Sequence, residues 1–272
     1  MSSFTELVDV MARLRGPDGC PWDREQTHAT LKPYLLEEAY EALDAIDACN
    51  DDELCGELGD VLLQVVFHAQ IAAEEGRFSI EEVGRTIVDK LVRRHPHVFA
   101  NVAVDGADQV LKNWEQIKKE ERREQGASAP SLLDGIPAQL PALMRAQRIQ
   151  ARASKQGFDW DLIDGPLDKV EEEFAELRQA CQKCDAAAVE DEFGDVLFAM
   201  VNIGRFLKVD SEQALRASAG KFERRFRALE EKVAATGREL ADLSLEELDA
   251  IWDEVKEGEE ITSAAVRADA QR

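Results

Sequence analysis

Acidic residues at helical spacing are the side chains of this sequence best suited to chemistry. One group lies on two consecutive predicted helices and consists of Glu37, Glu38, Glu41, Glu57 and Asp60. Residues three or four apart lie on one face of a helix, so the carboxylates of each helix project together. If a turn near residues 50–52 makes the two helices antiparallel neighbours, the acids at positions 38, 41, 57 and 60 converge.

Converging carboxylates indicate a cation site. Two like charges about 5 Å apart repel by roughly 3 kcal/mol at an effective dielectric near 20, so the cluster is costly without a cation. Hard oxygen ligands with no neighbouring Cys or His favour Mg²⁺, or Mn²⁺ as a substitute, over zinc. A di-iron carboxylate site would need Glu-x-x-His, whereas the second motif here ends in aspartate. A solvated acidic helix face is the alternative that spacing leaves open.

The acidic group occurs twice, which makes a solvated face a weaker interpretation. The same five acids recur 135 positions later, as Glu172, Glu173, Glu176, Glu192 and Asp195. Trp22 and Trp114 are likewise followed, 138 residues later, by Trp160 and Trp252. Self-similarity over this length indicates two tandem copies of one unit. We therefore expect a metal site in each copy.

Basic residues follow the second acidic group and are suited to polyphosphate. Lys221, Arg224 and Arg225 lie on the next predicted helix, where ammonium and guanidinium donors can neutralise phosphate oxygens beside a bound metal. Trp252 with Lys256 offers a stacking surface and a further cation. A solvated basic stripe and a core tryptophan are the alternatives. In the first copy Pro96 should end the helix just after the basic residues, so the second copy supports them better.

The elements that position these residues are predicted to be helices. Apolar residues recur at helical period, as over residues 30–49, and alternation typical of strands is nearly absent. Ser79 with Glu82 and Ser244 with Glu247 form capping boxes, while Asp51 and Asp185 are predicted N-caps. Residues 61–67 and 196–201 are apolar on nearly all sides, which is typical of central bundle helices and would place Asp60 and Asp195 near the interior. The predicted fold class is all-α.

Proline and glycine mark the division between the copies. The segment 125–141 contains three of the eight prolines and follows a highly charged helix end. We expect an N-terminal helical domain over residues 1–124, a linker over 125–141 and a C-terminal helical domain over 142–272.

Composition excludes several classes of function. With 33 basic and 56 acidic residues the formal net charge is −23, which disfavours nucleic acid as a partner. The sequence has no run of 18 apolar residues, no start typical of a signal peptide and no phosphate-binding P-loop motif, so we expect a cytoplasmic protein with no membrane partner. The five cysteines are odd in number and are expected to be free thiols; Cys181-x-x-Cys184 lacks the second pair of a zinc site.

Glu37-Glu38-x-x-Glu41 followed by Glu57-x-x-Asp60 resembles the signature of the MazG-type all-α nucleoside triphosphate pyrophosphohydrolases. The segment CPWDREQTHATLKPYLLEEAYEALDAI in the first copy and KQGFDW in the second are similar to that family too. The resemblance covers nearly the whole chain. It implies Mg²⁺-dependent hydrolysis of nucleoside triphosphates to a nucleoside monophosphate and pyrophosphate, by a homodimer built from helical bundles. It also implies that the second copy is the main hydrolytic site.

Carried onto this sequence, the resemblance implies that Mg²⁺ is held by Glu173, Glu176, Glu192 and Asp195. It implies nucleotide contacts for Lys169, Lys221, Arg225, Trp252 and Lys256. Glu172 is placed to orient the attacking water. The competing hypothesis is a non-catalytic acidic interaction protein that dimerises through its helices, and it predicts no Mg²⁺-dependent turnover.

Overall fold

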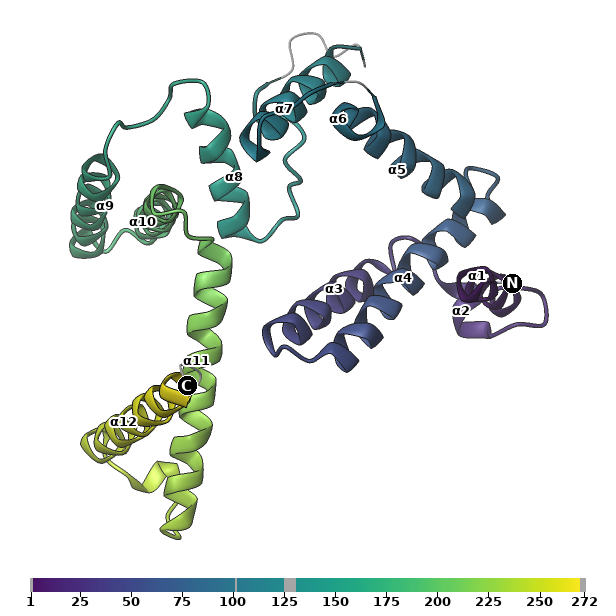
Figure 1. The fold of residues 1–272 in the computed structure, drawn as a ribbon. Coiled ribbons are helices and arrows are strands. Elements are labelled where there is room, and N and C mark those ends of the chain that lie inside the picture. Colours follow the sequence, from purple (N-terminus) through teal and green to yellow (C-terminus); the bar gives the residue numbers. More distant parts are fainter. Residues whose placement is uncertain (1, 101, 125–130, 270–272) are drawn as a thin grey trace. The chain divides into compact units, whose positions relative to one another are not determined.

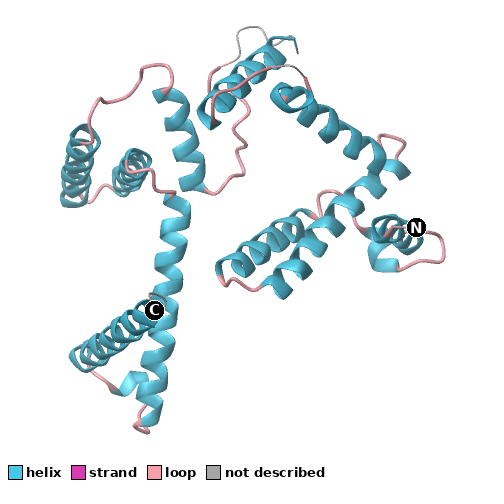
Figure 2. Ribbon diagram, viewed as in Figure 1, coloured by secondary structure: helices cyan, strands magenta, loops and turns pink. Residues whose placement is uncertain are grey.

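The computed structural model describes residues 2–100, 102–124 and 131–269, and no strand occurs within these ranges (Figures 1 and 2). The predicted all-α class is confirmed. The chain divides into two compact units, residues 1–128 and 129–272. Part of the expected linker, residues 125–130, lies outside the described residues, so the domain limits of 1–124 and 142–272 stay a prediction. No helix within the described ranges is long and apolar enough to cross a lipid bilayer.

Unit 1 is built around a long helical hairpin. Its helices are α1 (Ser3–Leu14), α2 (Pro21–Glu25), α3 (Lys32–Asp47), α4 (Asp51–Glu74), α5 (Ile80–Arg94), α6 (Pro96–Phe99) and α7 (Ala107–Glu124). Helices α3 and α4 form the hairpin, and α1 packs on the C-terminal half of α4 (Figure 1). The core of this unit consists of Met11, Leu31, Val66, Phe67 and Ile71.

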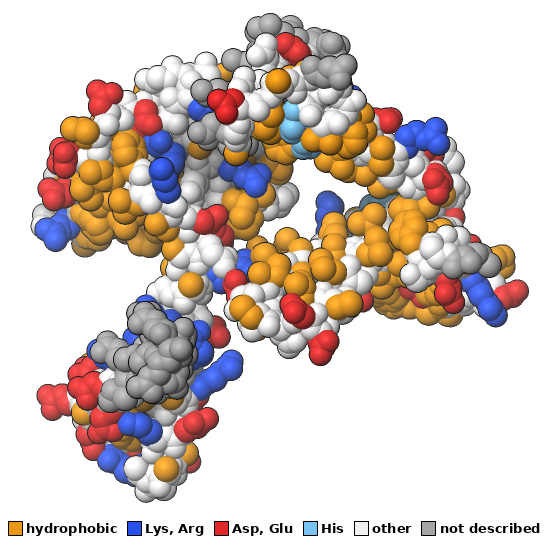
Figure 3. Space-filling view, viewed as in Figure 1, with side chains coloured by type: hydrophobic (Ala, Val, Ile, Leu, Met, Phe, Trp, Pro, Cys, Tyr) orange, Lys and Arg blue, Asp and Glu red, His pale blue; other side chains and the backbone are white. Residues whose placement is uncertain are grey.

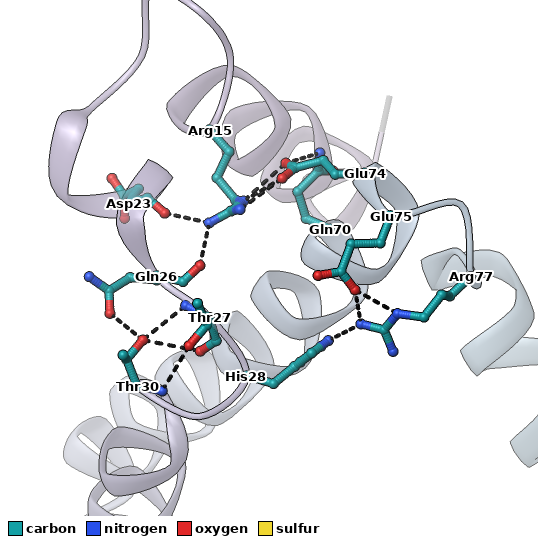
Figure 4. Close-up of polar contacts among 10 residues, drawn as sticks. All are labelled: Arg15, Asp23, Gln26, Thr27, His28, Thr30, Gln70, Glu74, Glu75 and Arg77. Atoms are coloured by element: carbon teal, nitrogen blue, oxygen red, sulfur yellow. Dashed lines mark hydrogen bonds and ion pairs between the residues drawn. The ribbon is translucent and has the colours of Figure 1, made fainter.

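Polar contacts close the end of unit 1 opposite the hairpin turn (Figure 4). The Arg15 guanidinium donates to Glu74 on α4 at 2.7 Å and to the backbone carbonyls of Asp23 and Gln26. One side chain therefore joins the end of α1, helix α2 and the end of α4. The same ion pair lowers the pKa of the Glu74 carboxyl.

Unit 2 repeats the hairpin. Its helices are α8 (Ala142–Ser154), α9 (Asp164–Lys183), α10 (Ala186–Phe206), α11 (Ser211–Ala235), the 3₁₀ helix η1 (Leu240–Asp242) and α12 (Leu245–Asp269). Helices α9 and α10 pair as α3 and α4 do, and α8 packs on α10. Helix α11 contacts α8 and also packs against α12 around Leu229, Val233 and Val255.

The helix starts follow the sequence, with one correction. The capping boxes at Ser79 and Ser244 form as predicted, with reciprocal hydrogen bonds to Glu82 and Glu247. The predicted N-cap Asp185 accepts hydrogen bonds from two backbone N–H groups, both at 3.2 Å. Asp51 was the wrong cap for α4: Asn50 accepts from the Glu53 N–H, and Asp51 is the first helical residue. Asn50 has the extended backbone of an N-cap, so its side chain reaches the free N–H groups first.

The two hairpins are less enclosed than the sequence predicts. Within residues 61–67, Val66 and Phe67 are buried whereas Leu62 and Val65 are more than a third exposed. On α10, Val196 and Val201 are buried but other apolar side chains are open, namely Leu197, Phe198 and Met200. Figure 3 shows apolar side chains gathered over both hairpins. Each hairpin therefore buries one face within the described chain and leaves another uncovered.

Candidate active site: two carboxylate centres

Each hairpin brings acidic side chains from two helices together, as the spacing predicts. In unit 2 the carboxylate oxygens of Glu173, Glu192 and Asp195 lie within 4.8 Å of one another; we call these residues the C-terminal centre. In unit 1 the same holds for Glu38, Glu41 and Glu57, the N-terminal centre. The short turns between the paired helices set this register, because helices that fold straight back place residues equidistant from the turn side by side.

The two centres differ in composition although their sequences correspond. Glu176 lies outside the compact group of the C-terminal centre, and Asp60 lies outside that of the N-terminal centre. Asp60 and Asp195 are exposed, which corrects the prediction that both sit near the interior. Each aspartate directly precedes the apolar run of its helix and is left uncovered at that point. Glu173, by contrast, is only 5% exposed.

Desolvation and the crowding of like charges together raise the pKa values of acids in both centres. The pKa of Glu192 is raised, first by partial desolvation and then by the negative charges of Glu176 and Glu173. Desolvation and its acidic neighbours Glu41 and Asp60 raise the pKa of Glu57 in the same way. The pKa of Glu38 is raised by desolvation and by Asp60. A divalent cation would relieve the same repulsion that these protons relieve.

A lysine belongs to the C-terminal centre. Lys169 Nζ lies 2.6 Å from Glu173 and 3.0 Å from Glu172, and these contacts raise the pKa of the lysine. The repeat shift of 135 places Tyr34 at this position in unit 1, where its ring contacts Trp22 edge-on at 5.9 Å. The i,i+4 spacing of Lys169 and Glu173 was the signal in the sequence for this pair.

The other predicted nucleotide contacts lie on α11 and α12. Arg225 Nε donates to Glu259 at 2.7 Å, and Lys256 pairs with Asp253 at 2.6 Å. Trp252 packs against Phe222 and the core around Leu229. Lys221 and Arg224 are exposed. Among the described residues, no hydrogen bond or ion pair joins these five side chains to the C-terminal centre.

Unit 1 shows the same helix–helix ion pairing. Arg93 and Arg94 both contact Glu121, at 2.7 and 2.6 Å, and Glu121 corresponds to Glu259 at the shift of 138. The repeated basic residues therefore have a structural role in joining two long helices that are separated in sequence by a short one. Sequence spacing alone could not separate that role from phosphate binding, since both need a cation at the same position.

The chain is similar to known proteins over most of its length. The MazG nucleotide pyrophosphohydrolase domain matches residues 26–99 and 166–229, which contain both carboxylate centres. A nucleoside triphosphate pyrophosphohydrolase/pyrophosphatase from Thermotoga maritima is 51% identical over 257 residues, or 94% of this chain and 97% of the relative. A nucleoside triphosphate pyrophosphohydrolase from Escherichia coli is 50% identical over 262 residues, or 95% and 99%. One from Mycolicibacterium smegmatis is 43% identical over 169 residues, or 61% and 51%.

Proposed function

The chain belongs to the MazG nucleotide pyrophosphohydrolase family, and from that premise we propose which of its side chains carry the reaction. The protein is a nucleoside triphosphate pyrophosphohydrolase, in keeping with relatives about half identical over nearly its whole length. We infer that hydrolysis takes place at the C-terminal centre. The observation that carries this inference is the convergence of Glu173, Glu192 and Asp195 beside Lys169.

The donor set of the C-terminal centre fits Mg²⁺. All its ligand atoms are carboxylate oxygens from two helices, and their mutual repulsion calls for a hard cation. The residues proposed to hold it are Glu173, Glu176, Glu192 and Asp195, with Mn²⁺ as a substitute ion. When bound, the ion neutralises charge that develops on the triphosphate oxygens. Glu38, Glu41, Glu57 and Asp60 are proposed as the equivalent ligands in unit 1.

The protein's own groups have separate roles in this proposal. Lys169 is already held beside the carboxylates and is proposed to neutralise a phosphate oxygen. Glu172, whose exposed carboxylate lies 3.0 Å from Lys169 Nζ, is proposed to orient the attacking water. Lys221, Arg224, Arg225, Trp252 and Lys256 remain proposed nucleotide contacts, which requires α11 and α12 to approach a carboxylate centre of this or another copy.

We propose a homodimer, supported by the open apolar faces of the hairpins. Large side chains exposed there include Leu36 and Leu58 in unit 1 and Phe174 and Phe193 in unit 2. Burying apolar surface is worth about 25 cal/mol per Å², and contiguous open patches mark interfaces. Light scattering at micromolar concentration should give twice the chain mass of 30.3 kDa, and a mass of 30.3 kDa would refute the dimer. A cytoplasmic location and the lack of a nucleic-acid partner stay predictions from the sequence.

The metal and the product are tested together. The protein is incubated with each nucleoside triphosphate and Mg²⁺, and pyrophosphate and orthophosphate are assayed separately. We expect pyrophosphate release that stops with EDTA and returns with Mg²⁺ or Mn²⁺. Full activity in chelator would exclude the metal proposal. The non-catalytic interaction hypothesis predicts no turnover under any of these conditions.

A further inference from the structure

Two histidines of unit 1 contact each other and belong to neither carboxylate centre. His28 lies in the connection between α2 and α3, residues 26–31, and His68 lies on α4. Their Nδ1 atoms are 2.7 Å apart, and the rings are stacked with centroids 5.0 Å apart. Both side chains are half-buried. We call these two residues the histidine pair.

An arginine determines which nitrogen of each ring carries a proton. A terminal nitrogen of Arg77 lies 2.5 Å from His28 Nε2, and Arg77 Nε donates to Glu75 at 2.6 Å (Figure 4). A guanidinium only donates hydrogen bonds, so His28 Nε2 accepts. The one proton of a neutral His28 is then on Nδ1 and is donated to Nδ1 of His68. His68 therefore accepts at Nδ1 and carries its own proton on Nε2.

This arrangement does not accept another proton. A second proton on His28 would be on Nε2, which would then meet the Arg77 guanidinium as a donor and as a like charge. A second proton on His68 would be on Nδ1 and would meet the N–H of His28. In either case a hydrogen bond is lost and positive charge is added beside Arg77. The contacts therefore require both rings to be neutral.

In the described part of unit 1, no carboxylate forms a hydrogen bond or ion pair with either ring. Charged side chains at the adjoining ends of the surrounding elements are Arg15, Asp23, Lys32, Glu74, Glu75 and Glu82. Of the acids, Glu74 pairs with Arg15, Glu75 pairs with Arg77, and Glu82 accepts from the N-cap of α5. The pKa of His68 is lowered, first by burial and then by the charge of His28.

The histidine pair holds the middle of the connection. At one end the Gln26 carbonyl accepts from Arg15 at 3.2 Å, and at the other end Leu31 is buried in the core of unit 1. Between them the backbone N–H groups of Thr27 and Thr30 donate to each other's hydroxyls, at 2.9 and 3.2 Å. Those bonds lie within the turn itself, whereas His28 joins the turn to α4.

We propose that the histidine pair is a proton-sensitive latch, which holds the connection on α4 while both rings are neutral and releases it when either ring takes up a proton. A histidine that is neutral only in the closed state makes closing about tenfold less favourable for each pH unit below its ordinary pKa of 6.5. The latch is therefore closed at neutral pH and weakens as the pH falls below about 6.5. The inference is independent of the hydrolysis proposed for unit 2, because both rings belong to unit 1.

Hydrogen exchange of the full chain at pH 7.5 and 5.5 measures the opening, with protection factors corrected for the intrinsic exchange rate at each pH. Protection of residues 26–31 in the wild type should fall at least about tenfold between the two values. Arg77→Gln should show a smaller fall, because the glutamine amide oxygen can accept from a protonated His28. His97→Gln, at a half-buried histidine of unit 1 outside the pair, is the matched control and should match the wild type.

Equal protection at both pH values in the wild type would overturn the latch, and so would an undiminished fall in Arg77→Gln. If Arg77→Gln leaves the connection unprotected even at pH 7.5, the ring tautomers of the wild type decide. Nitrogen NMR of the histidine-labelled wild type at pH 7.5 should show His28 protonated at Nδ1 and His68 protonated at Nε2. Another tautomer of either ring, or a charged ring at that pH, would overturn the proposal.

Discussion

At the scale of single residues, Lys169 distinguishes the C-terminal centre from its counterpart. Its ammonium group lies 2.6 Å from Glu173, a carboxylate that is almost fully buried. Removing the lysine would leave that buried charge without its partner, which is costly. A divalent cation can then supply the missing positive charge. The lysine and the metal are therefore expected to substitute for each other in stabilising the folded chain.

Lys169→Gln should accordingly destabilise the metal-free protein and increase its response to Mg²⁺. In EDTA we expect a loss of about 1 kcal/mol, a modest value because Lys169 is partly exposed. Thermal unfolding should show a larger Mg²⁺-induced rise in Tm for the variant than for the wild type. Lys232→Gln, which breaks an exposed pair with Glu254, is the control and should respond as the wild type does. Equal Mg²⁺ responses in all three proteins would contradict the role given to Lys169.

How far the sequence could predict the site depends on the residue. Helical spacing and a short turn predict that Glu38 lies near Glu57 and Glu173 near Glu192, because these features fix the positions of the backbone. The exclusion of Glu176 and Asp60 from the compact groups could not be predicted, because it depends on side-chain rotamers. The exposure of Asp195 could not be predicted either, because an apolar run shows that part of a helix will be buried but not how far the cover extends to the residues before it.

At the scale of elements, ion pairs join α5 to α7 in unit 1 and α11 to α12 in unit 2. Arg94 and Arg93 hold the pKa of Glu121 at about 2, well below the ordinary 4.5, chiefly by hydrogen bonding to its charged form. A carboxyl with a lowered folded pKa contributes stability above its unfolded pKa and loses it as the pH falls through the folded value. The contribution of Glu121 should therefore be complete at pH 7 and decline between about 4.5 and about 2.

Glu121→Gln should lower the free energy of unfolding at pH 7 by about 1–2 kcal/mol. Urea titrations of the wild type and the variant at pH 7, 5 and 3 test this. The difference in the free energy of unfolding between the wild type and the variant should be the same at pH 7 and pH 5 and smaller at pH 3. Glu120→Gln, one position away on α7 and exposed, should change little at any pH. A difference that persists undiminished at pH 3 would show that the ion pair is not its source.

Local signals predicted the helices well because they act over a few residues. The capping boxes at Ser79 and Ser244 satisfy free N–H groups within one turn, so neighbouring sequence is enough to identify them. The partners of the basic residues on α5 and α11 are 27 or more positions away, at Glu121 and Glu259. Contacts at that separation depend on how helices pack, which the periodicity of one helix does not specify.

At the scale of the whole molecule, duplication has produced two units with the same hairpin and different surroundings. Unit 1 has Tyr34 against Trp22 and a proline at the start of α2, whereas unit 2 has Lys169 beside its acids and an exposed phenylalanine, Phe158, before α9. The repeat itself could be read from the sequence. The division of labour could not, because the acids correspond at every position and the differences lie in the residues around them.

The central claim is that the C-terminal centre carries the hydrolysis. Glu192 and Glu57 are corresponding residues, each half-buried in its own centre, so Glu192→Gln and Glu57→Gln form a matched pair. The decisive measurement is kcat for pyrophosphate release by the two full-length variants at saturating Mg²⁺ and nucleotide. Glu192→Gln should lose at least about a hundredfold, the effect of several kcal/mol of transition-state stabilisation, and Glu57→Gln should stay within about twofold of the wild type. A large loss in Glu57→Gln with activity kept in Glu192→Gln would contradict the account.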